Sequence, residues 1–231
     1  GRYIIAKKRA DTTVNEKIED QLTEAVRLIN SEVYEKAIEL LRDLVEKHPN
    51  SLEGWYNLGI ALARASNLDE AEEAYDEALA IDNQVFEIWF NKGNVLYELG
   101  DYEKAKECYE KALELDPDDA EAWNNLGNTY SRLTKGQKAI EAYTKAVALR
   151  PNYAEALYNK ANAHFIEHED ERAIAYAETA MRLDPSLASH VNQWLSVARD
   201  RLEAEEHHEK YKKEKKDSEL LDGTNGGSKE E

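Results

Sequence analysis

Residues 120–153 read AEAWNNLGNTYSRLTKGQKAIEAYTKAVALRPNY, and the chain repeats this pattern along most of its length. Trp55, Trp89 and Trp123 follow one another at intervals of 34 residues, and Leu157 takes the next place. Alanines keep the same spacing at Ala37, Ala71, Ala105, Ala139 and Ala173. All four prolines of the protein end such segments, at positions 49, 117, 151 and 185. A period of this length indicates a protein built from stacked supersecondary units.

Each unit predicts two helices of about a dozen residues, which are too short to be stable alone in water. Proline cannot continue a helix, so each proline ends the second helix of one unit and sets the turn into the next. Small residues that recur in both helices let their backbones approach closely. We expect the aromatic side chains of Tyr75, Tyr109 and Tyr143 to fill the seams between the paired helices.

The motif resembles the tetratricopeptide repeat, whose key positions are Trp, Leu, Gly, Tyr, Ala, an aromatic residue, Ala and Pro. Residues 120–153 match all of them, with Trp123, Leu126, Gly127, Tyr130, Ala139, Tyr143, Ala146 and Pro151. The resemblance implies an all-α, right-handed superhelical α-solenoid of five tandem repeats, with bounds at 18–51, 52–85, 86–119, 120–153 and 154–187. The last repeat has Ala161 for the glycine and His164 for the tyrosine, and the first lacks the Trp and the Gly. Terminal repeats of a solenoid are usually atypical in this way.

The segments outside the repeats differ in character. Residues 1–17 form a basic N-terminal arm, with five Lys or Arg against two acids. We expect residues 188–206 to form a helix that caps the last repeat, because one face of that segment is apolar: Val191, Trp194, Leu195, Ala198 and Leu202. Residues 207–231 are highly charged and end in a Gly/Ser-rich stretch. We expect a fraying helix there, followed by disorder.

The overall composition argues against several kinds of partner and location. A net charge of −18 on 231 residues argues against nucleic acid as a partner. No apolar stretch approaches the length that spans a bilayer, so membrane contact is not expected. Cys108 is the only cysteine, which excludes an intrachain disulfide. Such cysteine usage is typical of a reducing compartment, and we expect a cytoplasmic protein.

The motifs of catalysis and of metal binding are missing from the sequence. It contains no Gly-rich phosphate loop, nucleophile elbow or metalloprotease motif, so we predict a non-enzymatic protein with no catalytic residues. His164 and His168 are one helical turn apart, a spacing that suits zinc, but no third ligand accompanies them. We therefore expect neither a metal site nor a cofactor.

A polar stripe runs along the predicted first helices, opposite their packing face. With the tryptophan position at zero, the asparagine positions fall at about 140° and 200° around the helix. The stripe consists of Asn57, Asn91, Asn125 and Asn159 at one position of the repeat, and Asn94, Asn128 and Asn162 three residues later. The same side carries Glu87, Glu121 and Glu155, and the aromatic residues Phe90 and Tyr158 flank it.

In the family that the chain resembles, first helices line a concave surface, so the resemblance implies that this stripe faces a groove. An amide offers both a donor and an acceptor, and can therefore bond the N–H and C=O groups of an extended peptide. We predict a protein–protein interaction scaffold or adaptor whose asparagine ladder binds an extended, neutral-to-basic peptide.

The acidic C-terminal tail of chaperones is not the predicted ligand. Counted from the first residue of a repeat, family members that bind this tail carry a lysine at position 5 and, two repeats later, a lysine at position 2 and an arginine at position 6. In this chain position 2 is Glu in repeats two to five, and position 5 is Tyr56, Phe90, Asn124 or Tyr158. Three alternatives to peptide binding stay open. The asparagines could reflect family ancestry alone, the chain could be a structural assembly or self-association module, or it could be a repeat domain excised from a larger protein.

Overall fold

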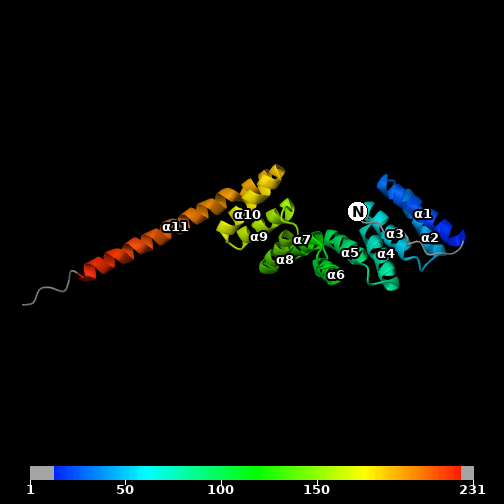
Figure 1. Cartoon of the computed structure of the whole chain (residues 1–231), viewed down its shortest axis with the longest axis horizontal. Coiled ribbons are helices and arrows are strands. Elements are labelled where there is room, and N and C mark those ends of the chain that lie inside the picture. Colours follow the sequence, from blue (N-terminus) through cyan, green and yellow to red (C-terminus); the bar gives the residue numbers. More distant parts are fainter. Residues whose placement is uncertain (1–12, 225–231) are drawn as a thin grey trace, which may run out of the picture. The chain divides into compact units, whose positions relative to one another are not determined.

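The computed structural model describes residues 13–224, and within this range every regular element is helical (Figure 1). The chain divides into two compact units, with the division between Arg150 and Pro151. We call them the N-terminal and the C-terminal unit. The basic arm predicted for residues 1–17 lies mostly outside the described residues, as do residues 225–231.

The N-terminal unit consists of helix pairs packed in tandem, as the sequence predicted. Its helices are α1 (Thr13–Asn30), α2 (Tyr34–Lys47), α3 (Leu52–Arg64), α4 (Leu68–Ile81), α5 (Phe86–Leu99), α6 (Tyr102–Leu115), α7 (Ala120–Arg132) and α8 (Gly136–Leu149). Each predicted repeat of this unit contains one pair, although α1 begins five residues before the predicted bound at residue 18. The repeat bounds themselves stay a prediction.

The first helix of every pair ends in the same way. The residue after its C-terminal turn has a left-handed backbone, and these residues recur every 34 positions: Glu32 (φ 59°), Ser66 (φ 64°), Gly100 (φ 83°), Thr134 (φ 56°) and His168 (φ 61°). The N–H group that follows each of them bonds back to the helix, as in Asn67 N to Leu62 O at 2.9 Å. This arrangement satisfies the last carbonyl groups of the helix and reverses the chain into its partner.

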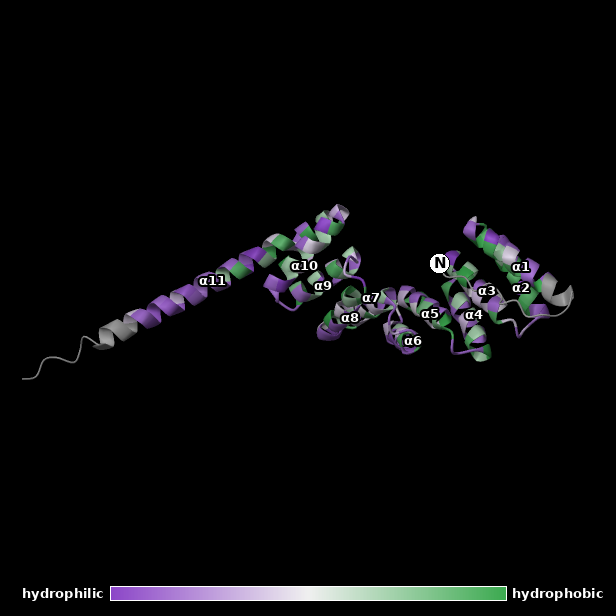
Figure 2. Cartoon of the chain, viewed as in Figure 1, coloured by the Kyte–Doolittle hydropathy of each residue, from purple (hydrophilic) through white to green (hydrophobic). Residues whose placement is uncertain are grey.

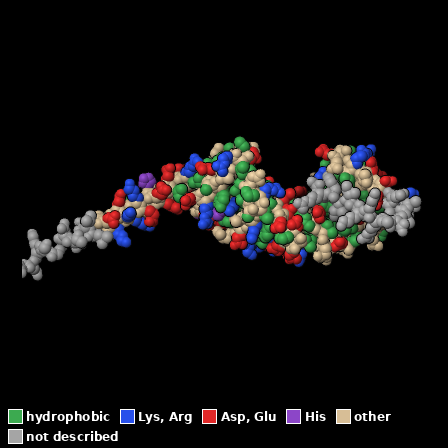
Figure 3. All heavy atoms as spheres, viewed as in Figure 1, with side chains coloured by type: hydrophobic (Ala, Val, Ile, Leu, Met, Phe, Trp, Pro, Cys, Tyr) green, Lys and Arg blue, Asp and Glu red, His purple; other side chains and the backbone are tan. Residues whose placement is uncertain are grey.

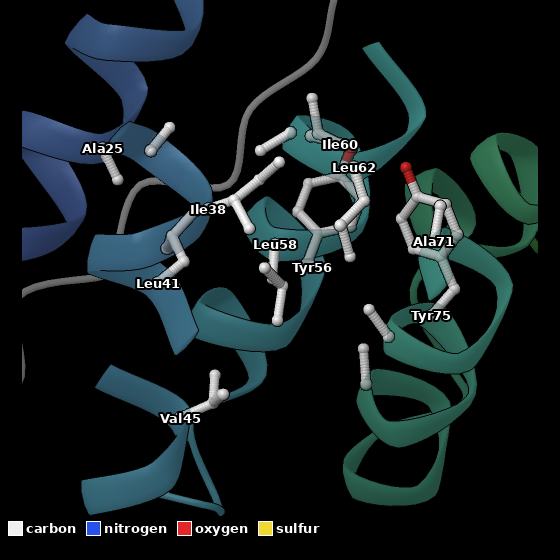
Figure 4. Packing of buried hydrophobic residues seen from close by; sticks show 14 of the residues in the cluster. Ala25, Ile38, Leu41, Val45, Tyr56, Leu58, Ile60, Leu62, Ala71 and Tyr75 are labelled. Atoms are coloured by element: carbon white, nitrogen blue, oxygen red, sulfur yellow. The ribbon is translucent and has the colours of Figure 1, made fainter. Parts of the chain in front are cut away.

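Tyrosines of the second helix in a pair pack directly against glycines of the first helix. A Cβ atom added at Gly59 would lie 2.5 Å from a ring carbon of Tyr75, and one at Gly127 would lie 2.5 Å from a ring carbon of Tyr143. Figure 4 shows Tyr75 beside Tyr56 in the core that α1–α4 build. The glycine therefore sets how closely the paired helices approach, because any larger residue would displace the ring.

The tryptophans that recur every 34 residues link each helix pair to the turn that precedes it. Trp55 Nε1 donates to Pro49 O at 2.9 Å, Trp89 Nε1 to Asn83 O at 2.9 Å, and Trp123 Nε1 to Pro117 O at 2.8 Å. The indole ring of each Trp is partly buried, so its apolar face contributes to the core while its one donor is satisfied at the surface.

The C-terminal unit contains α9 (Ala154–Ile166), α10 (Asp170–Leu183), a 3-10 turn (Pro185–Leu187) and α11 (Ala188–Thr224). Four of the five residues predicted for the apolar face of the cap are buried, and Val191, Trp194, Leu195 and Ala198 pack in one cluster with alanines of α9 and α10. The fifth, Leu202, is partly buried. In this unit α11 therefore covers the apolar surface of the helix pair, as the sequence predicted.

Residues 207–224 continue helix α11, while the fraying and the disorder expected for residues 207–231 stay predictions. Helix α11 continues unbroken through the charged segment to Thr224, with exposed side chains from Glu203 to Ser218 (Figures 2 and 3). Glu and Lys have high helix propensity, and ion pairs such as Lys212–Glu209 at 3.1 Å add to it. An anchored helix also extends without a new nucleation cost. None of the helices between residues 13 and 224 combines the length and apolar character needed to cross a bilayer.

Candidate functional site

Three asparagines of the predicted stripe make side-chain hydrogen bonds in the N-terminal unit, in two separate sets. Asn94 Oδ1 accepts two bonds, from Tyr109 OH at 2.7 Å and from Asn125 Nδ2 at 3.0 Å. Asn91 Nδ2, one turn before Asn94 on α5, donates to Tyr56 OH at 2.8 Å. These bonds join α5 to α3, α6 and α7, so the amides are held in fixed orientations.

A fourth amide is fixed by a seam tyrosine in the same way. Asn128 Oδ1 accepts from Tyr143 OH at 2.8 Å, which repeats the Tyr109–Asn94 bond one repeat later. Burial raises the pKa of the Tyr109 hydroxyl well above its usual range, so the hydroxyl keeps its proton and stays a donor. The tyrosine that packs on the glycine therefore also orients the asparagine.

The hydrogen bonds of Asn91, Asn94, Asn125 and Asn128 leave one polar atom of each side-chain amide without a partner among residues 17–218. These atoms are Asn91 Oδ1, Asn94 Nδ2, Asn125 Oδ1 and Asn128 Nδ2. In chain order they are acceptor, donor, acceptor and donor. We call these four partly exposed residues the amide row. An amide oxygen can accept and its nitrogen can donate, so the row has bonding capacity for a ligand.

A pocket of about 250 Å³ opens beside the amide row. Three of its lining residues belong to the row, and the full lining is Asn94, Tyr97, Glu98, Tyr109, Asn125 and Asn128. Tyr97 is held by an edge contact with Tyr102, with ring centroids 5.3 Å apart, and its hydroxyl accepts from Arg132 Nε at 3.2 Å. The pocket wall is therefore built from fixed side chains of α5, α6 and α7.

Asn57 is a correction to the predicted site. Its side chain is fully buried, and Nδ2 donates to Glu53 O at 2.8 Å, on the preceding turn of its own helix. The helical position is the one that the other asparagines occupy, but α1 also packs against α3. The amide of Asn57 therefore lies within the protein interior and is not accessible to a peptide.

The other residues predicted for the N-terminal unit lie at or near the surface. Glu121 is exposed and Glu87 is partly exposed. Phe90 is partly buried, because it stacks on Phe86 with centroids 5.6 Å apart and contacts Tyr109 edge-on at 6.1 Å. Phe90 therefore supports the tyrosine that orients Asn94, in addition to any contact with a ligand.

The remaining predicted residues belong to the C-terminal unit. Asn159 and Asn162 on α9 are partly exposed, and Glu155 is exposed. Tyr158 contacts His190 of α11, with ring centroids 6.1 Å apart, and packs against the cap cluster. The cap thus takes part of the aromatic surface that the sequence assigned to a ligand.

Sequence reasoning missed Glu98 as a pocket residue. It lies in the last turn of α5, four residues after Asn94, and its side chain is exposed. The signal was present, because residues three and four apart on a helix share a face. Tyr109 was predicted only as a seam residue, and its hydroxyl bond to Asn94 adds the second role.

The histidines with zinc-like spacing have other partners. His164 is buried, its Nδ1 lies 2.8 Å from Glu169 Oε2, and its ring stacks on Tyr176. His168 interacts with Arg201 of α11. Within residues 13–224, no three His, Cys, Asp or Glu side chains are grouped to hold a metal ion. Burial raises the pKa of the Cys108 thiol to about 12, which keeps it protonated and weakly nucleophilic.

Profiles of one repeat family match this helix arrangement along the chain. Profiles described as tetratricopeptide repeat match residues 22–85, 74–107, 120–153 and 154–187, and one described as TPR repeat matches residues 93–133. Together they run from residue 22 to residue 187 without a gap. The chain belongs to the tetratricopeptide repeat family. It is therefore a protein of the interaction-scaffold kind, in a family whose members bind protein or peptide partners.

Solved structures of two proteins illustrate the similarity. A fragment of MamA from Desulfovibrio magneticus RS-1 is 26% identical, with a TM-score of 0.70 over 74% of this chain and 96% of that one. YrrB, described as a TPR protein with an unusual peptide-binding site, is 20% identical, with a TM-score of 0.68 over 80% of this chain and 100% of that one. The likeness to YrrB shows the fold alone. A comparison with curated protein sequences finds no match.

Proposed function

We propose that the N-terminal unit binds an extended segment of a partner protein along the amide row, and that the protein acts as a non-catalytic adaptor. The observation that carries this proposal is the alternation, in chain order, of the open amide groups: Asn91 Oδ1, Asn94 Nδ2, Asn125 Oδ1 and Asn128 Nδ2. An extended peptide presents N–H and C=O groups in alternation along its edge, so its donors can bond the open oxygens of the row and its acceptors the open nitrogens.

The energetics of such a row favour modest affinity. Each net hydrogen bond contributes about 1 kcal/mol, so four bonds give about 4 kcal/mol. Micromolar binding requires about 8 kcal/mol, and the remainder has to come from side-chain contacts such as those at Phe90 and in the adjacent pocket. The orientation of the amides by Tyr109 and Tyr143 lowers the entropy lost on binding, because these side chains are already ordered.

The charge of the protein sets the character of the ligand. Glu87 and Glu121 lie near the row, and the chain carries a net charge of −18. This field attracts a basic peptide, admits a neutral one and repels an acidic one, including a chaperone-like acidic tail. We assign the same ligand-binding role to Asn159 and Asn162 within the C-terminal unit, with Glu155 and Tyr158 beside them. A cytoplasmic location remains a prediction.

An isosteric substitution separates binding from folding. Asn94→Asp keeps the Oδ1 acceptor for Tyr109 and Asn125 but replaces the open Nδ2 donor by a carboxylate oxygen. The probe is a pool of N-acetylated, C-amidated nonapeptides of uncharged residues, measured by fluorescence anisotropy. We expect Asn94→Asp to weaken binding about fivefold or more. The matched control is Asn67→Asp, because Asn67 is exposed and makes no side-chain cap bond.

Two outcomes of this experiment would contradict the proposal. Equal affinities of Asn94→Asp and Asn67→Asp would show that the row does not contact the peptide backbone. If the peptide pool did not bind and sedimentation gave a mass above 26.4 kDa, self-association would replace peptide binding as the function.

A further inference from the structure

We infer that the pocket beside the amide row receives a lysine or arginine side chain of the bound peptide, and that Glu98 selects it. The inference rests on the proposed function, because the pocket gains its ligand only when a peptide lies along the row. It makes Glu98 a specificity-determining residue, because its carboxylate favours cationic side chains in the pocket over neutral or anionic ones. Neither the sequence pattern nor the family profiles assign this residue a role.

The lining of the pocket carries one formal charge. Of its six residues, three are asparagines, two are tyrosines, and Glu98 is the one carboxylate. Glu98 forms no ion pair with any residue between 13 and 224. An unpaired carboxylate at the edge of an otherwise uncharged pocket favours a cationic group over a neutral or anionic one.

The aromatic walls suit the same ligand. Tyr97 and Tyr109 both line the pocket, and a cation near the face of a tyrosine ring is attracted by the ring quadrupole. The alkyl part of a lysine or arginine packs on such apolar surface while its charged end reaches a polar partner. Asn125 Oδ1 supplies an uncharged acceptor in the same pocket, so more than one donor of the cation can be satisfied.

The nearby arginine does not oppose this assignment. Arg132 is not among the lining residues. Its Nε donates to Tyr97 OH at 3.2 Å, and its guanidinium lies over the Tyr102 ring at 5.9 Å. Arg132 therefore holds Tyr97 in place and has its own partners outside the pocket lining. The pocket volume of about 250 Å³ is enough to accommodate one long side chain.

The test uses five nonapeptide pools that differ only at the central residue, which is fixed as Lys, Arg, Gln, Met or Glu among uncharged neighbours. Each pool is titrated against the whole chain and its Glu98→Gln variant. The matched control is Glu107→Gln, which removes the same charge from an exposed position of α6. Residue 107 lies two positions from Tyr109, and therefore on the opposite side of that helix.

We expect the Lys and Arg pools to bind about three- to fivefold more tightly than the Gln pool, which is the range for a solvent-exposed ion pair. Glu98→Gln should remove this preference and leave the Gln and Met pools unchanged, whereas Glu107→Gln should preserve it. Added salt should reduce the preference in the same direction as Glu98→Gln.

The outcomes separate the inference from the function on which it rests. If the uncharged pools bind and Asn94→Asp weakens them, but Lys and Arg gain nothing over Gln, the assignment of Glu98 is overturned and the amide row stands. An equal loss of the Lys preference in Glu98→Gln and Glu107→Gln would overturn it too, because the effect would then arise from net charge. Failure of every pool to bind would overturn both proposals.

Discussion

Replacing Gly127 by alanine should destabilise the protein, although alanine is the better helix former. Gly127 lies within α7, where alanine would normally add about 1 kcal/mol of stability. An added Cβ, however, would lie 2.5, 2.6 and 3.0 Å from three ring carbons of Tyr143. Favourable carbon contacts begin at about 3.5 Å, so the ring would have to move by about 1 Å. Tyr143 is 3% exposed, and the space for such a movement is missing.

The two effects have different magnitudes. Overpacking of a buried site costs about 1 to 3 kcal/mol, and the overlap with three ring atoms places this site at the upper end. Subtraction of the propensity gain leaves a net loss of about 2 kcal/mol. The chain itself supports this reasoning: its last repeat has Ala161 facing Ala177 at the equivalent positions, and its first has Ala25 with Leu41. Alanine replaces the glycine where the tyrosine is also missing.

The measurement is the free energy of unfolding from urea titrations followed by far-UV circular dichroism. Gly127→Ala is made in the natural chain and again in a Tyr143→Leu chain. We expect a loss of about 2 kcal/mol in the first background, and in the second a gain of up to about 1 kcal/mol, because the ring is gone. The same loss in both backgrounds, or a gain in the natural chain, would refute the role of the ring contact.

Three further predictions concern buried ionisable groups. Cys108, whose pKa burial raises to about 12, should react with a disulfide reagent only after denaturation; rapid reaction of the folded protein would contradict its placement. Burial lowers the pKa of His164, so its neutral form stabilises the fold above pH of about 6.5. The melting temperature should therefore fall as the pH drops below this value, and less so in His164→Gln; equal slopes would exclude the histidine. The Asp170 carboxylate is 4% exposed and lies 2.6 Å from the Arg201 guanidinium, so Arg201→Ala should lower the free energy of unfolding by about 2 to 3 kcal/mol. Arg199→Ala removes an exposed ion pair and should lower it by under about 1 kcal/mol. Equal costs would contradict the buried pair.

Apolar spacing in the sequence predicted the helix pairs, whose pattern recurs every 34 residues, and the buried face of the cap, whose apolar residues follow the period of a helix. It did not predict the left-handed turn residues. Of the five, only Gly100 is a glycine, so the sequence carries little signal at the other positions. The extent of α11 was hard to predict for a related reason: low hydrophobicity favours fraying and disorder, whereas helix propensity and the anchored first turns favour a continued helix.

The candidate site shows the same limit for polar residues. A helical position gives the direction of a side chain but not what covers it, and an asparagine can satisfy its amide inward or outward. Asn57 bonds its own helix and is buried, whereas Asn91 bonds a neighbouring tyrosine and stays partly exposed. Glu98 shares the face of Asn94, but its importance depends on a pocket that three helices build together.

The most direct test of the amide row is an ester scan of a bound peptide. In the tightest-binding uncharged nonapeptide, each peptide bond in turn is replaced by an ester, which removes one N–H donor and keeps the shape of the chain. Because the row offers two open acceptors, Asn91 Oδ1 and Asn125 Oδ1, we expect a loss of about fivefold at two positions of the peptide and little change at the others. A uniform loss along the peptide, or none, would show that the asparagines do not bind its backbone.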